Sequence, residues 1–194
     1  MVSSSVVVMV SHSHKFIFVH ITKTGGTSAT QVLKKYLYDA PMKQHETAVE
    51  CRDRIGKDLF SEYFKFTFVR NPWDKMVSMY HYLRQSKNLY RNLGISFKDW
   101  VSDVEKLDQE ERSTSSQLSW IEENGEILVD FIGKFESYEE DFEKVKNKLQ
   151  LQCSKLNHIN QSQHLEYRSY YDEATKDIVR SRFEEDIEFF KYKF

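Results

Sequence analysis

The chain has 194 residues, a mass of 23.2 kDa and a formal net charge of −2, with 40% hydrophobic and 30% charged residues. This length is sufficient for one buried core, and the 14 Phe and 11 Tyr residues argue against a disordered chain. The small net charge provides no long-range field for a nucleic-acid backbone, so no nucleic-acid partner is expected.

Residues 1–14 are rich in Ser, Val and His, and we expect a flexible N-terminal arm followed by one domain over residues 15–194. The apolar run Val6–Val10 is too short for a membrane span or for the core of a signal peptide, and no basic segment precedes it. The sequence therefore predicts no integral membrane segment and a cytoplasmic protein.

The first predicted unit is a P-loop-like strand, loop and helix. Lys15–His20 is continuously apolar at its centre, as expected for a central parallel strand covered on both faces, and apolar residues at helical spacing predict a helix from Ser28 to about Tyr38. The loop between them offers backbone N–H groups, hydroxyls and one cation to a phosphate-sized anion. Its candidate ligands are Lys23, Thr24, Gly25, Gly26, Thr27 and Ser28.

This loop departs from the Walker A pattern of nucleotide triphosphatases. That pattern places Gly five positions before its second Gly and Lys directly after it, whereas here Ile21 and Thr27 flank Gly26 at those positions. The loop cation, Lys23, instead precedes the glycines, which weakens the case for a triphosphate and for Mg²⁺.

A second strand, loop and helix is predicted around Phe64–Val69 and the following Asn71-Pro72. Arg70 lies at the carboxyl end of this strand, and Ser78 lies two turns into the helix, so that a guanidinium and a hydroxyl can converge on another anion. Two anion sites indicate a ligand with two phosphate groups.

Later elements complete the pattern. Ser96 with Asp99 resembles a capping box, a strand is predicted at Ile127–Ile132 with a helix following Gly133, and the last helix is expected to start near Asp172. Alternating strands and helices predict an α/β fold, a single domain with a mainly parallel central sheet flanked by helices. Ligands of such sheets bind at the carboxyl ends of the strands, where both predicted loops lie.

The two loops resemble those of sulfotransferases that use 3′-phosphoadenosine 5′-phosphosulfate (PAPS), in particular the carbohydrate and heparan-type branch and its short bacterial relatives. The similar segments are His20–Ser28, Phe68–Tyr80, Val129–Phe142 and the C-terminal stretch, and the likeness spans about Lys15 to Phe194. The resemblance implies sulfuryl transfer from PAPS, without a metal, to a hydroxyl of a small molecule or glycan.

In that family the first loop holds the 5′-phosphosulfate and the second holds the 3′-phosphate, so the resemblance assigns catalysis to Lys23 and 3′-phosphate binding to Arg70 and Ser78. Relatives commonly carry a His in a context similar to that of His45, which makes His45 the candidate base, with Glu46 as the alternative. The resemblance also suggests roles for Gln117 and for Lys134, where many relatives have Arg.

Several alternatives stay open. A P-loop kinase-like phosphotransferase and a non-catalytic nucleotide-binding protein are the competing functions, and a lumenal domain separated from a Golgi anchor is the competing location. The acceptor, the oligomeric state and the pairing of Cys51 with Cys153 are not determined by the sequence.

Overall fold

The structure is a computed structural model that describes residues 9–37, 45–86, 94–103, 114–152 and 165–194. Two compact units share the chain: unit 1 comprises residues 1–69 and 119–160, and unit 2 comprises residues 70–118 and 161–194. Each unit combines segments that are far apart in sequence.

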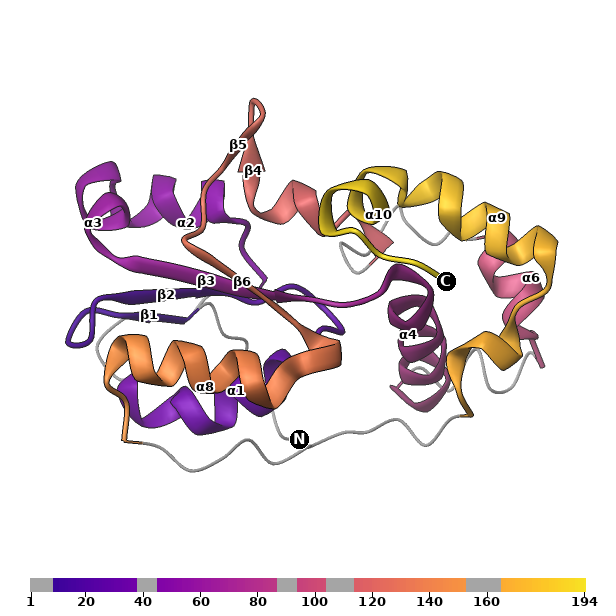
Figure 1. Cartoon of the computed structure of the whole chain (residues 1–194), viewed down its shortest axis with the longest axis horizontal. Helices are drawn as coiled ribbons and strands as arrows, with labels where there is room; N and C mark the ends of the chain where they lie inside the picture. The colour runs from indigo at the N-terminus through magenta and orange to yellow at the C-terminus, as the bar shows by residue number, and fades with distance from the viewer. Residues whose placement is uncertain (1–8, 38–44, 87–93, 104–113, 153–164) are drawn as a thin grey trace. The chain divides into compact units, whose positions relative to one another are not determined.

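Unit 1 contains a four-stranded sheet in the order β1-β2-β3-β6 (Figure 1). Its strands are β1 (Met9–Ser11), β2 (Phe16–Val19), β3 (Phe64–Val69) and β6 (Phe131–Lys134). β2, β3 and β6 run parallel, and β1 pairs antiparallel with β2. The α/β fold with a mainly parallel sheet is therefore confirmed.

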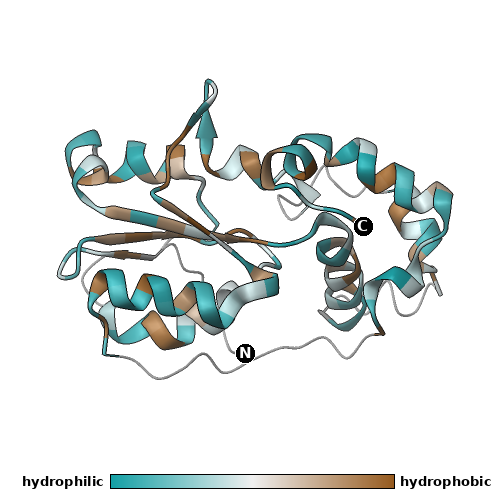
Figure 2. Ribbon diagram, viewed as in Figure 1, coloured by the Kyte–Doolittle hydropathy of each residue, from teal (hydrophilic) through white to brown (hydrophobic). Residues whose placement is uncertain are grey.

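Helices cover both faces of this sheet (Figure 1). α1 (Gly26–Leu33) and α8 (Tyr138–Leu149) cover one face, while α2 (Ala48–Ile55) and α3 (Lys57–Glu62) cover the other. β2 is buried at all four positions, as its apolar sequence predicts. Figure 2 shows this concentration of hydrophobic residues along the strands.

Aromatic residues build the core between the sheet and the pair α1 and α8. Phe16, Phe18, Phe66 and Phe68 from neighbouring strands pack there, with Phe142 of α8. Short elements connect the larger ones in this unit: η1 (Lys34–Tyr36), the hairpin of β4 (Glu122–Glu123) and β5 (Glu126–Ile127), and η4 (Phe135–Ser137). η3 (Leu118–Trp120) begins at the last residue of the first segment of unit 2 and continues into unit 1.

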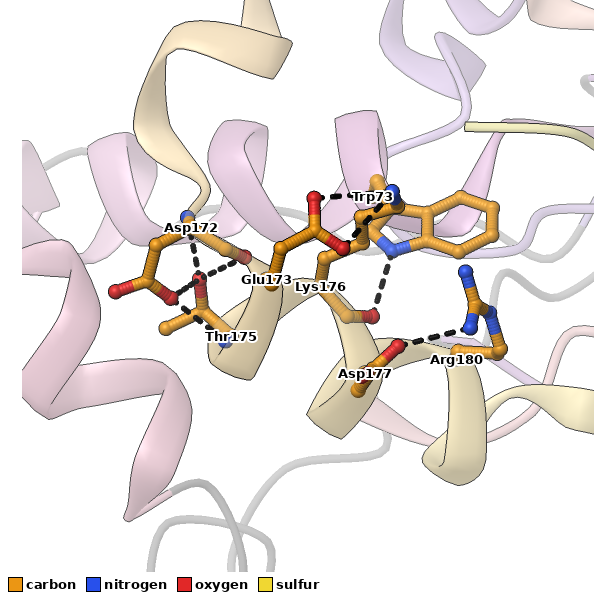
Figure 3. Close-up of polar contacts among 7 residues, drawn as sticks. All are labelled: Trp73, Asp172, Glu173, Thr175, Lys176, Asp177 and Arg180. Atoms are coloured by element: carbon orange, nitrogen blue, oxygen red, sulfur yellow. Dashed lines mark hydrogen bonds and ion pairs between the residues drawn. The ribbon is translucent and has the colours of Figure 1, made fainter.

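Unit 2 is helical. It contains α4 (Pro72–Ser86), α6 (Phe97–Ser102), η5 (Tyr167–Tyr170), α9 (Glu173–Arg182) and α10 (Glu184–Phe190), whose apolar faces meet around Trp73, Trp100 and Phe183. The Trp73 indole N–H donates to the Lys176 carbonyl oxygen at 3.1 Å, which joins α4 to α9 (Figure 3).

Several predicted boundaries are confirmed. β3 has the predicted bounds, Ser96 caps α6 by accepting from Asp99 N, and Asp172 caps α9 in a reciprocal box with Thr175 (Figure 3). A side-chain cap is a local interaction, so the sequence reveals it.

The structure differs from the sequence prediction at several places. The strand expected at Ile127–Ile132 is divided between β5 and β6, because the first part pairs in a local hairpin and only the second joins the central sheet. Met9–Ser11, predicted to be part of a flexible arm, form β1, because pairing with β2 satisfies their backbone groups. α2 and α3 were not predicted from the sequence at all.

Cys51 is a buried free thiol, whereas Cys153 lies outside the described residues. Among the helices that the structure describes, none has the length and apolar character needed to cross a membrane.

Candidate active site

The loop after β2 is a tight turn that depends on two adjacent glycines. Gly25 has a φ of 86°, in the left-handed region, and it lies directly before the first residue of α1. The Tyr138 hydroxyl, from α8, donates to the Gly25 carbonyl oxygen at 2.6 Å, and Ser28 N donates to the same oxygen at 3.0 Å. These two donors fix the direction in which α1 begins.

Gly26 is required for a different reason, which is the close approach of His20. A Cβ atom added to Gly26 would lie 1.9 Å from both Cδ2 and Nε2 of His20. Real Cβ atoms do not approach other heavy atoms so closely, so the His20 ring and a side chain at position 26 are incompatible. The imidazole of His20 therefore lies directly against the turn.

His20 belongs to a small cluster of imidazole and aromatic side chains in unit 1. Its ring centroid lies 5.1 Å from that of His45, and the His45 ring lies 6.2 Å from that of Trp120 in an edge-on arrangement. Burial is the main cause that lowers the pKa of His20 to about 3, with smaller electrostatic effects from the neighbouring His45 and Lys23, so His20 is neutral at neutral pH. The structure thus packs the His45 ring against the His20 imidazole, and the Lys23 cation acts electrostatically on the same ring.

The two residues predicted to act in catalysis have unusual backbone conformations. Lys23 has a φ of 63° and His45 a φ of 41°, both in the left-handed region that residues other than glycine seldom adopt. Such residues persist where the surrounding structure holds them, and they are concentrated at functional sites.

His45 and its neighbour Glu46 have different environments. Glu46 is buried and accepts from Nε and Nη2 of Arg54 at 2.9 to 3.0 Å, so its carboxylate is already engaged in an ion pair. His45 is half-buried, with Nδ1 3.4 Å from the His20 carbonyl oxygen. This contact favours the tautomer protonated on Nδ1, in which Nε2 is the basic nitrogen.

The hydroxyl residues of the loop differ in burial and in hydrogen bonding. The Thr24 side chain is buried and donates to the Ile21 carbonyl oxygen at 2.8 Å, so its hydroxyl stabilises the loop itself. Thr27 is exposed and Ser28 is buried, both in the first turn of α1. Thr22 Oγ1 is buried and has no hydrogen-bond partner within the described parts of the chain. A buried hydroxyl without a partner, in the loop that leads into a helix, fits an anion site.

The second predicted anion site begins where β3 ends. β2 and β3 are parallel neighbours, with Val19 opposite Thr67, and Arg70 is the residue after β3. Arg70 is largely buried, and its Nε donates to Asp74 Oδ2 at 2.8 Å within the first turn of α4. Ser78, one turn further along α4, is also buried.

The Arg70 backbone is held by the side chain of Gln117. Arg70 N donates to Gln117 Oε1 at 2.8 Å, and Gln117 Nε2 donates to the Arg70 carbonyl oxygen at 2.9 Å. Lys134, the other residue for which the resemblance suggests a role, ends β6, and its N–H donates to Asp141 Oδ2 at 2.8 Å.

Metal ligands are not grouped in the parts of the chain that the structure describes: no three His, Cys, Asp or Glu residues there are arranged to hold an ion.

The sequence analysis assigned no role in the site to His20, Thr22, Asp74 or Tyr138. A polar residue closing an apolar strand just before a glycine turn is a signal that could have identified His20. Tyr138 carries no comparable local signal, because it lies 113 positions from the glycine that it contacts.

The sequence model described as "Sulfotransferase family" matches residues 7–193. An uncharacterized protein of the archaeon Archaeoglobus fulgidus is 38% identical over 105 residues, which cover 52% of this chain and 78% of that protein. No solved structure gives a significant match.

Proposed function

The chain belongs to the sulfotransferase family, and from this premise we propose that it transfers a sulfuryl group from PAPS to a hydroxyl group. The proposed acceptor is a carbohydrate or another small alcohol. The observation that carries the proposal is the cluster of the glycine turn, Lys23, His20 and His45 in unit 1.

The glycine turn supports binding of the 5′-phosphosulfate. Gly25 and Gly26 bring the backbone close to any anion at the start of α1, where the helix dipole favours negative charge. In this proposal the N–H groups of residues 25–28 and the hydroxyls of Thr27 and Ser28 hold the phosphate, whereas the Thr24 hydroxyl keeps its structural hydrogen bond.

The proposed reaction is an in-line displacement at sulfur. The acceptor oxygen forms a bond to sulfur while the bond from sulfur to the bridging oxygen of the 5′-phosphate breaks. The electron pair of the broken bond stays on that oxygen, so the 5′-phosphate of the departing adenosine 3′,5′-bisphosphate gains one negative charge while the sulfonate charge goes to the product. Lys23 would stabilise this charge as it develops, and charge stabilisation of this kind needs no metal ion.

His45 is the proposed base that accepts the proton of the acceptor hydroxyl. The contact of Nδ1 with the His20 carbonyl oxygen supports this role, because a neutral ring that donates from Nδ1 carries its lone pair on Nε2. Glu46 is a weaker candidate because its carboxylate is buried against Arg54.

The proposed ligands of the 3′-phosphate are Arg70 and Ser78. The ion pair with Asp74 supports this role for Arg70. Asp74 contacts Nε of the guanidinium, whereas a bidentate contact with a phosphate would be made by the two Nη atoms.

Two measurements test this function. Purified protein is expected to bind adenosine 3′,5′-bisphosphate tightly and ATP weakly, with no dependence on Mg²⁺, and to transfer sulfate from PAPS to metabolite or glycan pools analysed by mass spectrometry. Tight Mg²⁺-dependent ATP binding with phosphate transfer would instead establish a kinase-like enzyme. Nucleotide binding without transfer to any acceptor would indicate a binding protein.

Matched variants assign the chemistry. Lys23→Ala and His45→Ala are each expected to lower kcat by about 10²-fold or more, with His45→Ala leaving the affinity for adenosine 3′,5′-bisphosphate within about twofold. Lys34→Ala and His14→Ala, which change exposed residues of unit 1, serve as controls and should keep normal activity. Full activity of His45→Ala would eliminate His45 as the base.

A further inference from the structure

Unit 2 contains a buried polar network whose members hold the main chain at Arg70. Gln117 and Asp186 have no exposed surface, and Arg70 is 7% exposed. A buried polar group without a hydrogen-bond partner costs free energy of folding. The hydrogen bonds that these residues make therefore identify the part of the chain that the network holds in place.

Gln117 pairs with Arg70 as a neighbouring strand would. Its carboxamide accepts from the Arg70 N–H at 2.8 Å and donates to the Arg70 carbonyl oxygen at 2.9 Å. β3 ends one residue earlier, at Val69, so this carboxamide continues backbone pairing through the residue where the chain leaves the sheet. Both soft dihedral angles of Arg70 are thereby restricted.

Asp186, in the first turn of α10, holds Gln117 in turn. Its Oδ2 accepts from Gln117 N at 2.8 Å and from Gln117 Nε2 at 3.3 Å. Its Oδ1 accepts from Leu118 N at 2.9 Å and from the Ser116 hydroxyl at 2.7 Å. One carboxylate therefore fixes both the backbone and the side chain of Gln117.

The network acts on Arg70 together with the ion pair to Asp74. The carboxamide sets the position of the Arg70 backbone, and Asp74 Oδ2 sets the direction of the guanidinium through Nε. Buried charged and polar groups of this kind add little stability compared with apolar packing, whereas they do fix one geometry. An arginine fixed at both ends is suited to bidentate recognition of a phosphate monoester.

We propose that Gln117, held by Asp186, is a positioning residue that makes the Arg70 site selective for nucleotides carrying a 3′-phosphate. This inference rests on the proposed function, because it takes the 3′-phosphate as the anion that Arg70 receives. In this proposal Gln117 acts through the Arg70 backbone, so its effect is expected on selectivity between nucleotides.

The test compares two probes, adenosine 3′,5′-bisphosphate and adenosine 5′-phosphate, which differ by the 3′-phosphate. Gln117→Met keeps the length of the side chain and removes both hydrogen bonds to Arg70. Its expected effect is a loss of about tenfold or more in affinity for the bisphosphate, while the affinity for the monophosphate changes by less than about twofold. Gln31→Met, at an exposed glutamine of α1, is the matched control.

If Gln117 had a purely structural role, Gln117→Met would lower the affinities for both nucleotides by the same factor. An unchanged ratio of the two affinities would therefore overturn the proposal. In the Arg70→Ala background, Gln117→Met should have no further effect on the ratio, because the positioned group is gone. A further fall in the ratio in that background would also contradict it.

Folding of each variant is checked by its far-UV spectrum and melting temperature. If Gln117→Met does not fold, Ser116→Ala removes a single donor to Asp186 and should lower the ratio by a smaller factor; an unchanged ratio there would overturn the proposal. The proposed function fails separately, if the unmodified protein shows no preference for the bisphosphate or if Arg70→Ala leaves that preference intact.

Discussion

Single residues at the first loop are constrained by contacts that come from different parts of unit 1. Gly25 is needed for its positive φ, whereas Gly26 is needed because the ring of His20 occupies the space of a Cβ atom. His20 also contacts His45, so the loop and the proposed base share one neutral imidazole. A change at position 26 should therefore affect both nucleotide binding and catalysis.

Gly26→Ala is predicted to abolish tight binding of adenosine 3′,5′-bisphosphate and to destabilise the fold by about 1–3 kcal/mol, because the new methyl group overlaps His20. Calorimetric titration and urea unfolding measure the two effects. The double variant Gly26→Ala/His20→Ala removes the overlapping ring and should recover part of the binding. If it binds no better than Gly26→Ala, the overlap is not the cause.

A second residue of interest is Lys75 in α4, whose side chain is completely buried. Its Nζ donates to the Ser115 carbonyl oxygen at 3.0 Å. Burial lowers the pKa of Lys75 from 10.5 to about 8, an effect that Asp186 opposes and Arg182 assists. Below pH 8 the folded state holds a buried cation, whose desolvation reduces the free energy of unfolding.

The unfolded chain binds more protons than the folded chain between about pH 8 and 10.5, so the contribution of Lys75 to stability rises with pH in that window. We predict that the wild type gains about 2 kcal/mol relative to Lys75→Met between pH 7 and about pH 9.5. Urea unfolding at several pH values measures this difference. Lys148→Met controls for loss of an exposed lysine, and a pH-independent difference between the wild type and Lys75→Met would show that Lys75 does not titrate in this range.

At the scale of elements, the start of α9 depends on one carboxylate. Asp172 accepts from Thr175 N at 2.8 Å and from Lys98 Nζ at 2.7 Å, which connects α9 to α6 (Figure 3 shows the α9 part). The Lys98 hydrogen bond and then the Thr175 donors hold the pKa of Asp172 well below its usual range.

Because its folded-state pKa is lowered, Asp172 stabilises the protein above the pKa of an ordinary aspartate, and this contribution is lost as the pH falls. Asp172→Asn keeps a capping oxygen but loses the ion pair, so its melting temperature at neutral pH should be lower than that of the wild type and should fall less on acidification. Thermal melts between about pH 7 and pH 3 test this. Parallel curves for the two proteins would contradict the assignment.

At the scale of the whole molecule, ligand binding should raise the free energy of unfolding. Adenosine 3′,5′-bisphosphate at about 100 times its dissociation constant is predicted to add about 2.7 kcal/mol, a rise of roughly 5–10 °C in melting temperature for a chain of this size. Adenosine at the same concentration should give no such rise. Equal shifts with the two compounds would show that the phosphates are not recognised.

The whole-molecule organisation also limits how the chain can be divided. Each compact unit is assembled from two separated segments, so neither unit corresponds to one continuous stretch of sequence. Because the sequence contains no linker between hydrophobic halves, this discontinuous arrangement could not be read from composition.

The sequence by itself determined the features that depend on neighbouring residues. The sequence predicts the apolar strands at Phe16–Val19 and Phe64–Val69 and the glycine turn after the first strand. It also predicts the cap at Ser96 and the start of a helix near Asp172, because these features depend on local periodicity and hydrogen bonding. These patterns also carried the resemblance to the sulfotransferase family, which the match over residues 7–193 confirms.

The tertiary structure decided which distant residues complete each site. The sequence does not predict three of these contacts: His20 with Gly26, Tyr138 with Gly25, and Gln117 with Arg70. The last two join residues that lie 113 and 47 positions apart. The division of the predicted strand at Ile127–Ile132 had the same origin, because pairing partners and not local preference fix where a strand begins. Long-range packing selects one partner among many sterically acceptable ones, and that selection depends on the whole fold.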